Sequence, residues 1–186
     1  MESRPQVISS HERFAGRVFR VRTDVVRYDD GGESVLDIVE HRGSYAIIAT
    51  PAPASLVLVR QYRHPAGREL WEIPAGTAEP GEAILEGALR ELAEETGFRA
   101  ARARLLGSLY MTPGFCNELL HFVAAEELTP GPTAFDEDER IEVRTFALSE
   151  AERLVAAGEI ADAKTVLALY WMRGGRGELA AGLADN

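Results

Sequence analysis

The stretch GTAEPGEAILEGALRELAEETGF, from Gly76 to Phe98, predicts a helix with acidic side chains concentrated near its end. We expect this helix to begin near Gly81 and to end before Gly97, because a glycine commonly follows the last helical turn. Its apolar residues recur at i, i+3, i+4 and i+7, a spacing that places one helix face towards the core. These residues are Leu85, Ala88, Leu89 and Leu92.

Three carboxylates, Glu91, Glu94 and Glu95, fall together beside the apolar stripe. Like charges at this spacing repel by roughly 0.2–0.5 kcal/mol per pair on an exposed helix, so the cluster costs stability unless a cation lies among them. Carboxylate oxygens are suitable ligands for hard divalent cations such as Mg²⁺ or Mn²⁺. The cluster therefore predicts a metal site at the edge of the core, and the alternative is a solvated acidic face.

The spacing of the whole stretch favours the metal site. The stretch follows the pattern G-x5-E-x7-R-E-U-x-E-E-x-G-U, in which U is a bulky apolar residue. The fixed places are filled by Gly76, Glu82, Arg90, Glu91, Glu94, Glu95 and Gly97, and the apolar places by Leu92 and Phe98. This pattern resembles the Nudix box without a departure. The resemblance implies an α/β (α+β) Nudix fold, with a mixed β-sheet between helices, and an enzyme that hydrolyses a nucleoside diphosphate linked to another moiety.

The resemblance also implies roles for the box residues. Glu91 and Glu95 are the expected catalytic metal ligands, Glu94 is a further ligand or bridge, and the backbone carbonyl of Ala75 contributes to the same site. The expected cofactor is Mg²⁺, for which Mn²⁺ or another divalent cation could substitute. The residues expected to hold the box in shape are Gly76, Glu82, Arg90 and Gly97.

The flanking segments narrow the substrate. QYRHPAGRELWEIPAGTAEPGE (61–82) and MTPGFCNE (111–118) resemble the ADP-ribose pyrophosphatase branch of this family. This branch implies hydrolysis of ADP-ribose to AMP and ribose 5-phosphate. The alternatives are a GDP-mannose, other nucleotide-sugar or FAD pyrophosphatase with the same chemistry, and a non-catalytic nucleotide-sensing module. The complete set of box carboxylates disfavours the non-catalytic module.

Two arginines and one turn are candidate substrate contacts. Arg63 follows an apolar strand and could hold a phosphate oxygen bidentately, and Arg42 is a weaker candidate for the same work. Pro113, Gly114 and Phe115 form a turn signal that could shape the substrate pocket. The alternative for the two arginines is that they are ordinary surface residues, and the alternative for the turn is that it has no role in binding.

The acidic segment FDEDE (135–139) is expected to lie in a loop. A mobile carboxylate beside a metal cluster can accept a proton as a general base. In the ADP-ribose pyrophosphatase branch the base comes from a glutamate of this loop. Position matching favours Glu137 as the base and Glu139 as a further metal contact.

The chain is expected to fold as one domain with an appended arm. Alternating residues in RVFRVRTDVVRY (17–28) and SVLDIVEH (34–41) predict two strands joined by a turn, so residues 1–42 are expected to form an N-terminal β-hairpin arm. Residues 43–175 would form the hydrolase domain, and 176–186 a tail. Further strands are expected in YAIIAT, SLVLVRQY and ELWEIPAG and near 104–111, 118–125 and 140–147, with helices at 149–157, capped by Ser149, and 162–173, capped by Asp162.

Composition limits the partners. The net charge of −10 disfavours a nucleic-acid partner, and no apolar run of 18 or more residues predicts a membrane span. The single cysteine and the absence of a signal-peptide pattern at the start favour the cytoplasm. Because a two-stranded hairpin is marginal alone, the arm is expected to pack in a homodimer.

Overall fold

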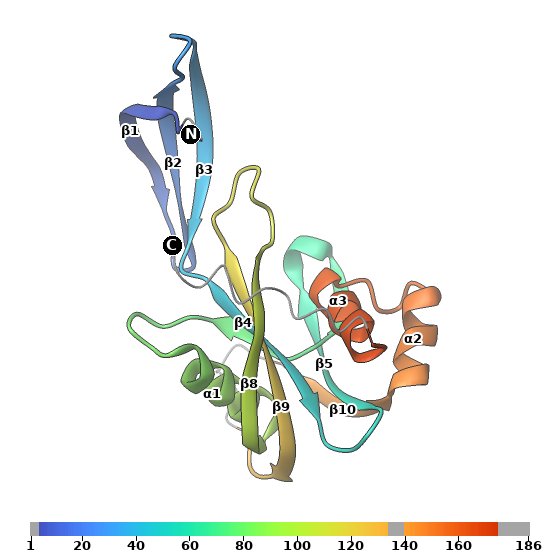
Figure 1. Ribbon diagram of the computed structural model, residues 1–186. Coiled ribbons are helices and arrows are strands. Elements are labelled where there is room, and N and C mark those ends of the chain that lie inside the picture. Colours follow the sequence, from blue (N-terminus) through green and yellow to red (C-terminus); the bar gives the residue numbers. More distant parts are fainter. Residues whose placement is uncertain (1–3, 134–139, 175–186) are drawn as a thin grey trace. The chain divides into compact units, whose positions relative to one another are not determined.

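The computed structural model describes residues 4–133 and 140–174, and these divide into two compact units (Figure 1). Unit 1 comprises the chain up to Gly43 together with Leu109–Leu120, and unit 2 comprises Ser44–Ser108 and the chain from His121 onwards. No helix among the described residues has the length and apolar character needed to cross a membrane.

Unit 1 is built on an antiparallel sheet in the order β1-β2-β3. Its strands are β1 (Gln6–Ala15), β2 (Phe19–Arg27) and β3 (Glu33–His41). The structure contains the two expected strands, and the turn between them closes through a hydrogen bond from the Tyr28 N–H to the Gly32 carbonyl at 2.9 Å. The expected hairpin is therefore extended by β1, which sequence periodicity missed because nearly all its residues are exposed on both faces.

A second segment of unit 1 pairs with β3. The backbone N–H of Val39 donates to the Phe115 carbonyl at 2.7 Å, and the N–H of Asn117 donates back to the Val39 carbonyl at 3.2 Å. The turn expected at 112–115 is present, because the N–H groups of Phe115 and Cys116 both donate to the Thr112 carbonyl.

Unit 2 contains two sheets where the sequence predicted one. The first has the order β7-β4-β9-β8, and the second has the order β10-β5-β6. The first is formed by β4 (Ser44–Thr50), β7 (Ala75–Thr77), β8 (Phe98–Tyr110) and β9 (Leu119–Pro130). The second is formed by β5 (Ser55–Arg63), β6 (Arg68–Glu72) and β10 (Glu142–Ala147). A short 3₁₀ turn, η1 (His64–Ala66), joins β5 to β6.

The expected strand ELWEIPAG divides at Ile73-Pro74, so that β6 joins one sheet and β7 joins the other. Pro74 has no N–H for a sheet ladder, while its carbonyl accepts a hydrogen bond from the Ile47 N–H at 2.8 Å. This crossing brings β7 to the edge of β4, where it pairs antiparallel.

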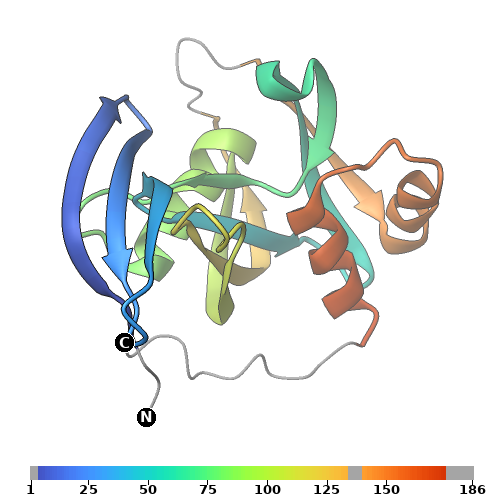
Figure 2. The same ribbon diagram turned by 90° about the horizontal axis from the view of Figure 1, so that it is seen from above.

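The helices are α1 (Ile84–Thr96), α2 (Leu148–Ala156) and α3 (Ala163–Met172). α1 packs on β4 and β7, whereas α2 contacts both α3 and β10 (Figure 2). The Asp162 cap is confirmed, because its side chain accepts a hydrogen bond from the Thr165 N–H at 3.0 Å. The Ser149 cap is wrong, because α2 begins one residue earlier and Ala147 is its N-cap.

The α+β class predicted from the sequence is confirmed. A buried core joins β4, β5, β9 and α1, and it fixes the helix against the sheet that carries β7. Its members are Tyr45, Ile47, Ala49, Val57, Ala88, Leu92, Val123 and Ala125.

Candidate active site

The acidic helix α1 lies with Ala88 and Leu92 fully buried, as its apolar spacing predicted. Leu85 is 38% exposed, because it belongs to the first turn, where the helix has only begun to cover the core. The last turn ends as expected at Gly97, which has a left-handed φ of 72° and donates its N–H to the Ala93 carbonyl at 2.9 Å.

Glu95 is directed at the start of β7. Its side chain is almost fully buried, at 3% exposure, and its Oε2 accepts a hydrogen bond from the Ala75 N–H at 3.0 Å. Burying a carboxylate is costly unless it is hydrogen-bonded or paired, so this contact indicates a site that is built around the charge. Ala75 thus lies next to a box carboxylate through its N–H, and the ligand role expected for its carbonyl stays a prediction.

Glu91, one turn earlier, also reaches β7. A Cβ added to Gly76 would lie 1.9 Å from Glu91 Cδ, so the carboxylate occupies the space where any side chain at position 76 would stand. The shape role expected for Gly76 therefore has a direct cause. Glu91 and Glu95 both lie against the Ala75-Gly76 backbone.

Arg90 is the cation that lies among the glutamates. Its Nε and Nη2 donate to the two oxygens of Glu82 at 2.8 and 3.1 Å, and its Nη1 donates to Glu91 at 3.0 Å and Glu94 at 2.8 Å. The bonds to Glu82 raise the pKa of the Arg90 guanidinium, and they lower the pKa of the Glu82 carboxyl. The expected shape roles of Glu82 and Arg90 agree with this geometry.

The donor set fits a hard cation in its chemistry. Glu91 and Glu95 offer carboxylate oxygens at one segment of backbone, and Glu94, whose side chain is 40% exposed, is held by Arg90. Within 4–133 and 140–174, no group of three or more acidic, histidine or cysteine side chains is placed to hold a metal ion together. The expected ligand Glu139 and the expected base Glu137 lie outside the described residues.

Arg63 is paired with a buried carboxylate that sequence analysis did not single out. Its Nε and Nη2 donate to both oxygens of Glu72 at 2.8 and 2.9 Å, and Lys164 Nζ donates to the same group. Burial alone would raise the pKa of Glu72, but the hydrogen bonds from Arg63 and the charge of Lys164 lower it. An acidic residue in the middle of the apolar run LWEIP was the signal for a buried ion pair.

This ion-pair group lies close to the box. The hydrogen bond to Glu72 is the main cause that raises the pKa of Arg63, and the negative charge of Glu95 raises it further. The N-terminal turn of α3 is fixed to the same corner, because Thr165 Oγ1 accepts a hydrogen bond from the Ile73 N–H at 2.8 Å. Arg63 therefore stands at the end of β5 with its charge directed towards two acidic side chains.

The remaining candidate contacts belong to unit 1. Arg42 is exposed between β3 and β4. Pro113, Gly114 and Phe115 form the turn described above, and Phe115 is 55% exposed. Their roles in substrate binding stay predictions.

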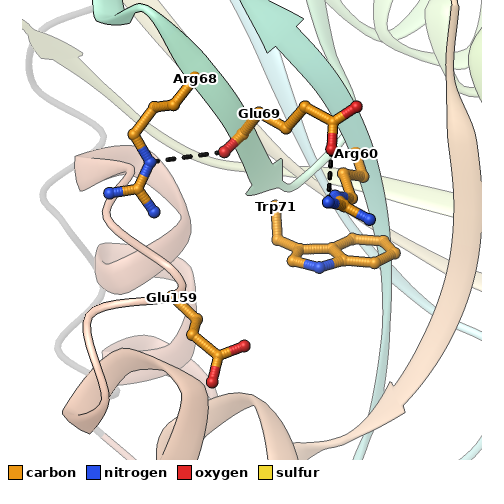
Figure 3. Close-up of a pocket in the computed structure, with 5 residues that line it drawn as sticks. All are labelled: Arg60, Arg68, Glu69, Trp71 and Glu159. Atoms are coloured by element: carbon orange, nitrogen blue, oxygen red, sulfur yellow. Dashed lines mark hydrogen bonds and ion pairs between the residues drawn. The ribbon is translucent and has the colours of Figure 1, made fainter.

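A separate hollow of about 240 Å³ lies beside β5 and β6 (Figure 3). It is lined by Arg60, Arg68, Glu69, Trp71 and Glu159, none of which is a candidate site residue. Arg60 forms ion pairs with Glu69 and Glu142, and its guanidinium lies over the Trp71 ring at 5.9 Å from the centroid. Arg68 donates to the backbone carbonyls of Glu69 and Gly158. Because no box carboxylate lines the hollow, we do not assign the chemistry of the box to it.

Comparisons with known proteins give the same family that the box pattern resembles. The NUDIX domain family model matches residues 40–169. The chain is 36% identical over 170 residues to an ADP-ribose pyrophosphatase of Bacillus subtilis, which covers 90% of this chain and 92% of the relative. A methanol dehydrogenase activator of Bacillus methanolicus has the same identity and coverage. A GDP-mannose pyrophosphatase of Shigella flexneri is 34% identical over 168 residues, covering 85% of this chain and 81% of the relative.

A solved structure supports the fold. The crystal structure of an ADP compounds hydrolase superposes with a TM-score of 0.80 at 25% identity, covering 91% of this chain and 92% of that one. The resemblance stated from the box is therefore confirmed over most of the sequence. The chain belongs to the NUDIX domain family.

Proposed function

We propose that the protein hydrolyses the pyrophosphate bond of ADP-ribose, giving AMP and ribose 5-phosphate, with Mg²⁺ as the cofactor. The observation that carries this proposal is the pair of carboxylates, Glu91 and Glu95, held against the Ala75-Gly76 backbone in a complete box. The similarity to an ADP-ribose pyrophosphatase along almost the whole chain supports the choice of substrate.

The box residues are proposed to hold the cation. Glu91 and Glu95 would be the main ligands, together with the Ala75 carbonyl. Glu94 would become a further ligand once its hydrogen bond to Arg90 breaks. A divalent cation in that place would neutralise charge on the diphosphate and so favour attack by water. Mn²⁺ has the same preference for oxygen ligands and could substitute.

The other side chains would orient the reactants. Glu137 would accept the proton of the attacking water, and Glu139 would be a further contact to the cation. Arg63 uses its Nε and Nη2 to bind Glu72, and we propose that its Nη1 donates to a phosphate oxygen of the substrate. Arg42 and the turn at 113–115 would contact the rest of the substrate.

A second candidate substrate is GDP-mannose, because a relative with that activity in its name is 34% identical over most of the chain. The box handles only the diphosphate, so its residues do not distinguish ADP-ribose from GDP-mannose, other nucleotide sugars or FAD. The contacts to the base and the terminal sugar decide this choice.

A substrate panel tests the proposal. Purified protein with Mg²⁺ would be given ADP-ribose, GDP-mannose and FAD, and products would be identified by chromatography. We expect the highest kcat/KM with ADP-ribose and equal amounts of AMP and ribose 5-phosphate. A higher kcat/KM with GDP-mannose than with ADP-ribose would make GDP-mannose the proposed substrate. If no compound were hydrolysed, the result would favour a non-catalytic module.

We also propose a cytoplasmic homodimer that forms through the N-terminal arm. Phe14 and Val35 lie on one face of the arm. Phe14 is opposite Val21 and Val35 is opposite Val25, and these two valines point to the same face of β2 because they are four residues apart. Their exposures of 53% and 69% are high for apolar residues in a sheet. A second copy of the chain would cover this face.

A further inference from the structure

Helix α1 contains a glycine where its own stability would favour almost any other residue. Gly87 is buried at the end of the first turn, and only proline is less favourable than glycine inside a helix. A Cβ at this position would lie 2.2 Å from Tyr45 Cε2 and 2.5 Å from Glu82 Oε2. The glycine therefore leaves room for an aromatic ring from β4 and for a box carboxylate.

Tyr45 joins that carboxylate to the core. Its side chain is 1% exposed, and its ring lies beside the Glu82 carboxylate, because a Cβ at Gly87 would be 2.6 Å from Tyr45 Cζ and 2.5 Å from Glu82 Oε2. Burial raises the pKa of the Tyr45 hydroxyl, and the nearby negative charge of Glu82 raises it further. The Glu82 carboxylate is in turn held by two donors of Arg90, at 2.8 and 3.1 Å. A buried hydroxyl with an ionised partner is a rigid point of attachment, because both groups lose water when they are buried.

From Glu82, the hydrogen bonds of Arg90 lead to the proposed metal ligands. Arg90 Nη1 donates to both Glu91 and Glu94, at 3.0 and 2.8 Å. The position of the guanidinium thus depends on Glu82 on one side, and it determines where two carboxylates lie on the other.

We propose that Tyr45 is a positioning residue for the metal site, acting through Glu82 and Arg90, and that Gly87 is the residue that admits it. This inference rests on the proposed function, since it concerns the cation that Glu91 and Glu95 would hold. Partners that orient metal ligands commonly change metal affinity by about 10–100-fold when they are removed. A residue that acts through two others is expected at the lower end of that range.

Tyr45→Phe is the direct test, because it removes the hydroxyl and keeps the ring. Mn²⁺ binding would be measured without substrate, from the electron paramagnetic resonance signal of the free ion. We expect the Kd for Mn²⁺ to rise by about 10-fold, while Tm falls by about 2–4 °C, the effect of one lost buried polar contact in a chain of this size. Tyr170→Phe, at an exposed site on α3, is the matched control and should change neither value.

A second pair of variants separates packing from positioning. Gly87→Ala should lower Tm, because the methyl group collides with a buried ring. In Tyr45→Val/Gly87→Ala the ring is absent, so the loss of Tm should be smaller than the sum of the two single losses. The hydroxyl is absent too, and the weaker Mn²⁺ binding should therefore persist.

The outcomes distinguish this inference from the proposed function. Unchanged Mn²⁺ affinity in Tyr45→Phe, with wild-type protein that binds Mn²⁺ and hydrolyses ADP-ribose, would overturn the role of Tyr45 alone. A wild-type protein that binds no Mn²⁺ would overturn both proposals. Weaker binding in Tyr45→Phe with an unchanged control supports the positioning role.

Discussion

The Glu91 carboxylate lies directly against the α-carbon of Gly76, at a place where a methyl group would be 1.9 Å from Glu91 Cδ. The helix and the strand can bring a carboxylate to this backbone only because position 76 has no side chain. The glycine at this place of the box pattern thus has a steric cause in this chain.

Gly76→Ala should reduce activity more than stability. The new methyl group would displace the end of a flexible side chain, so we expect Tm to change little. The displaced Glu91 carboxylate should lower kcat/KM for ADP-ribose by at least about 10-fold, in the range seen when metal ligands lose their orientation. Steady-state kinetics and thermal unfolding check this, and an unchanged kcat/KM would contradict the placement of Glu91.

Glu95→Gln should abolish most turnover while the protein stays folded. The amide oxygen can still accept the Ala75 N–H, and the change removes one of three clustered negative charges. We expect a loss of more than about 100-fold in kcat, because a direct ligand matters more than its supporting partners. Glu86→Gln, on the exposed side of the same helix, is the control and should keep its activity. Near-normal turnover of Glu95→Gln at saturating Mg²⁺ would contradict the proposal that Glu95 is a metal ligand.

The sequence predicted the box well because its information is local. Periodicity placed Ala88 and Leu92 in the core, and the Gly97 stop follows from backbone conformation alone. Contacts between distant segments were not predictable in the same way. The pairing of Arg63 with Glu72 and Lys164, and the fit of Tyr45 into the space left by Gly87, depend on how sheets and helices pack. β1 was missed because it carries no alternation between buried and exposed residues.

Val35→Asp should dissociate the proposed dimer. Val35 is 69% exposed, and a charge on that face would have to be desolvated in an interface. We expect light scattering to give the mass of one chain for the variant and of two chains for the wild type. Leu36→Asp, on the adjacent residue and so on the opposite face of β3, should leave the dimer intact. If the wild-type protein has the mass of one chain, the dimer proposal is wrong.

Gly97→Ala should destabilise the fold through two separate effects. The position has a φ of +72°, which costs a residue with a side chain about 1–2 kcal/mol. The added Cβ would also lie 2.4 Å from the backbone oxygen of Gly131, which cannot move as easily as a side chain. Gly81→Ala is the matched control, because its φ is +80° but nothing lies within 4 Å of the new Cβ. Urea unfolding should show a larger loss for Gly97→Ala, and equal losses would exclude the contact with Gly131 as a cause.

Glu72 should make the stability of the fold sensitive to acid. Its pKa in the folded protein is lowered from the ordinary value of 4.5, so its contribution is fully present above that pH and is lost as the pH falls through the lower, folded pKa. Glu72→Gln does not titrate, and its unfolding free energy should therefore fall less than that of the wild type below about pH 4.5. At pH 7 the variant should be less stable by about 1–3 kcal/mol, because Arg63 and Lys164 lose a charged partner. Urea unfolding at a series of pH values measures both effects, and parallel pH profiles for the two proteins would show that the lowered pKa of Glu72 contributes nothing to acid sensitivity.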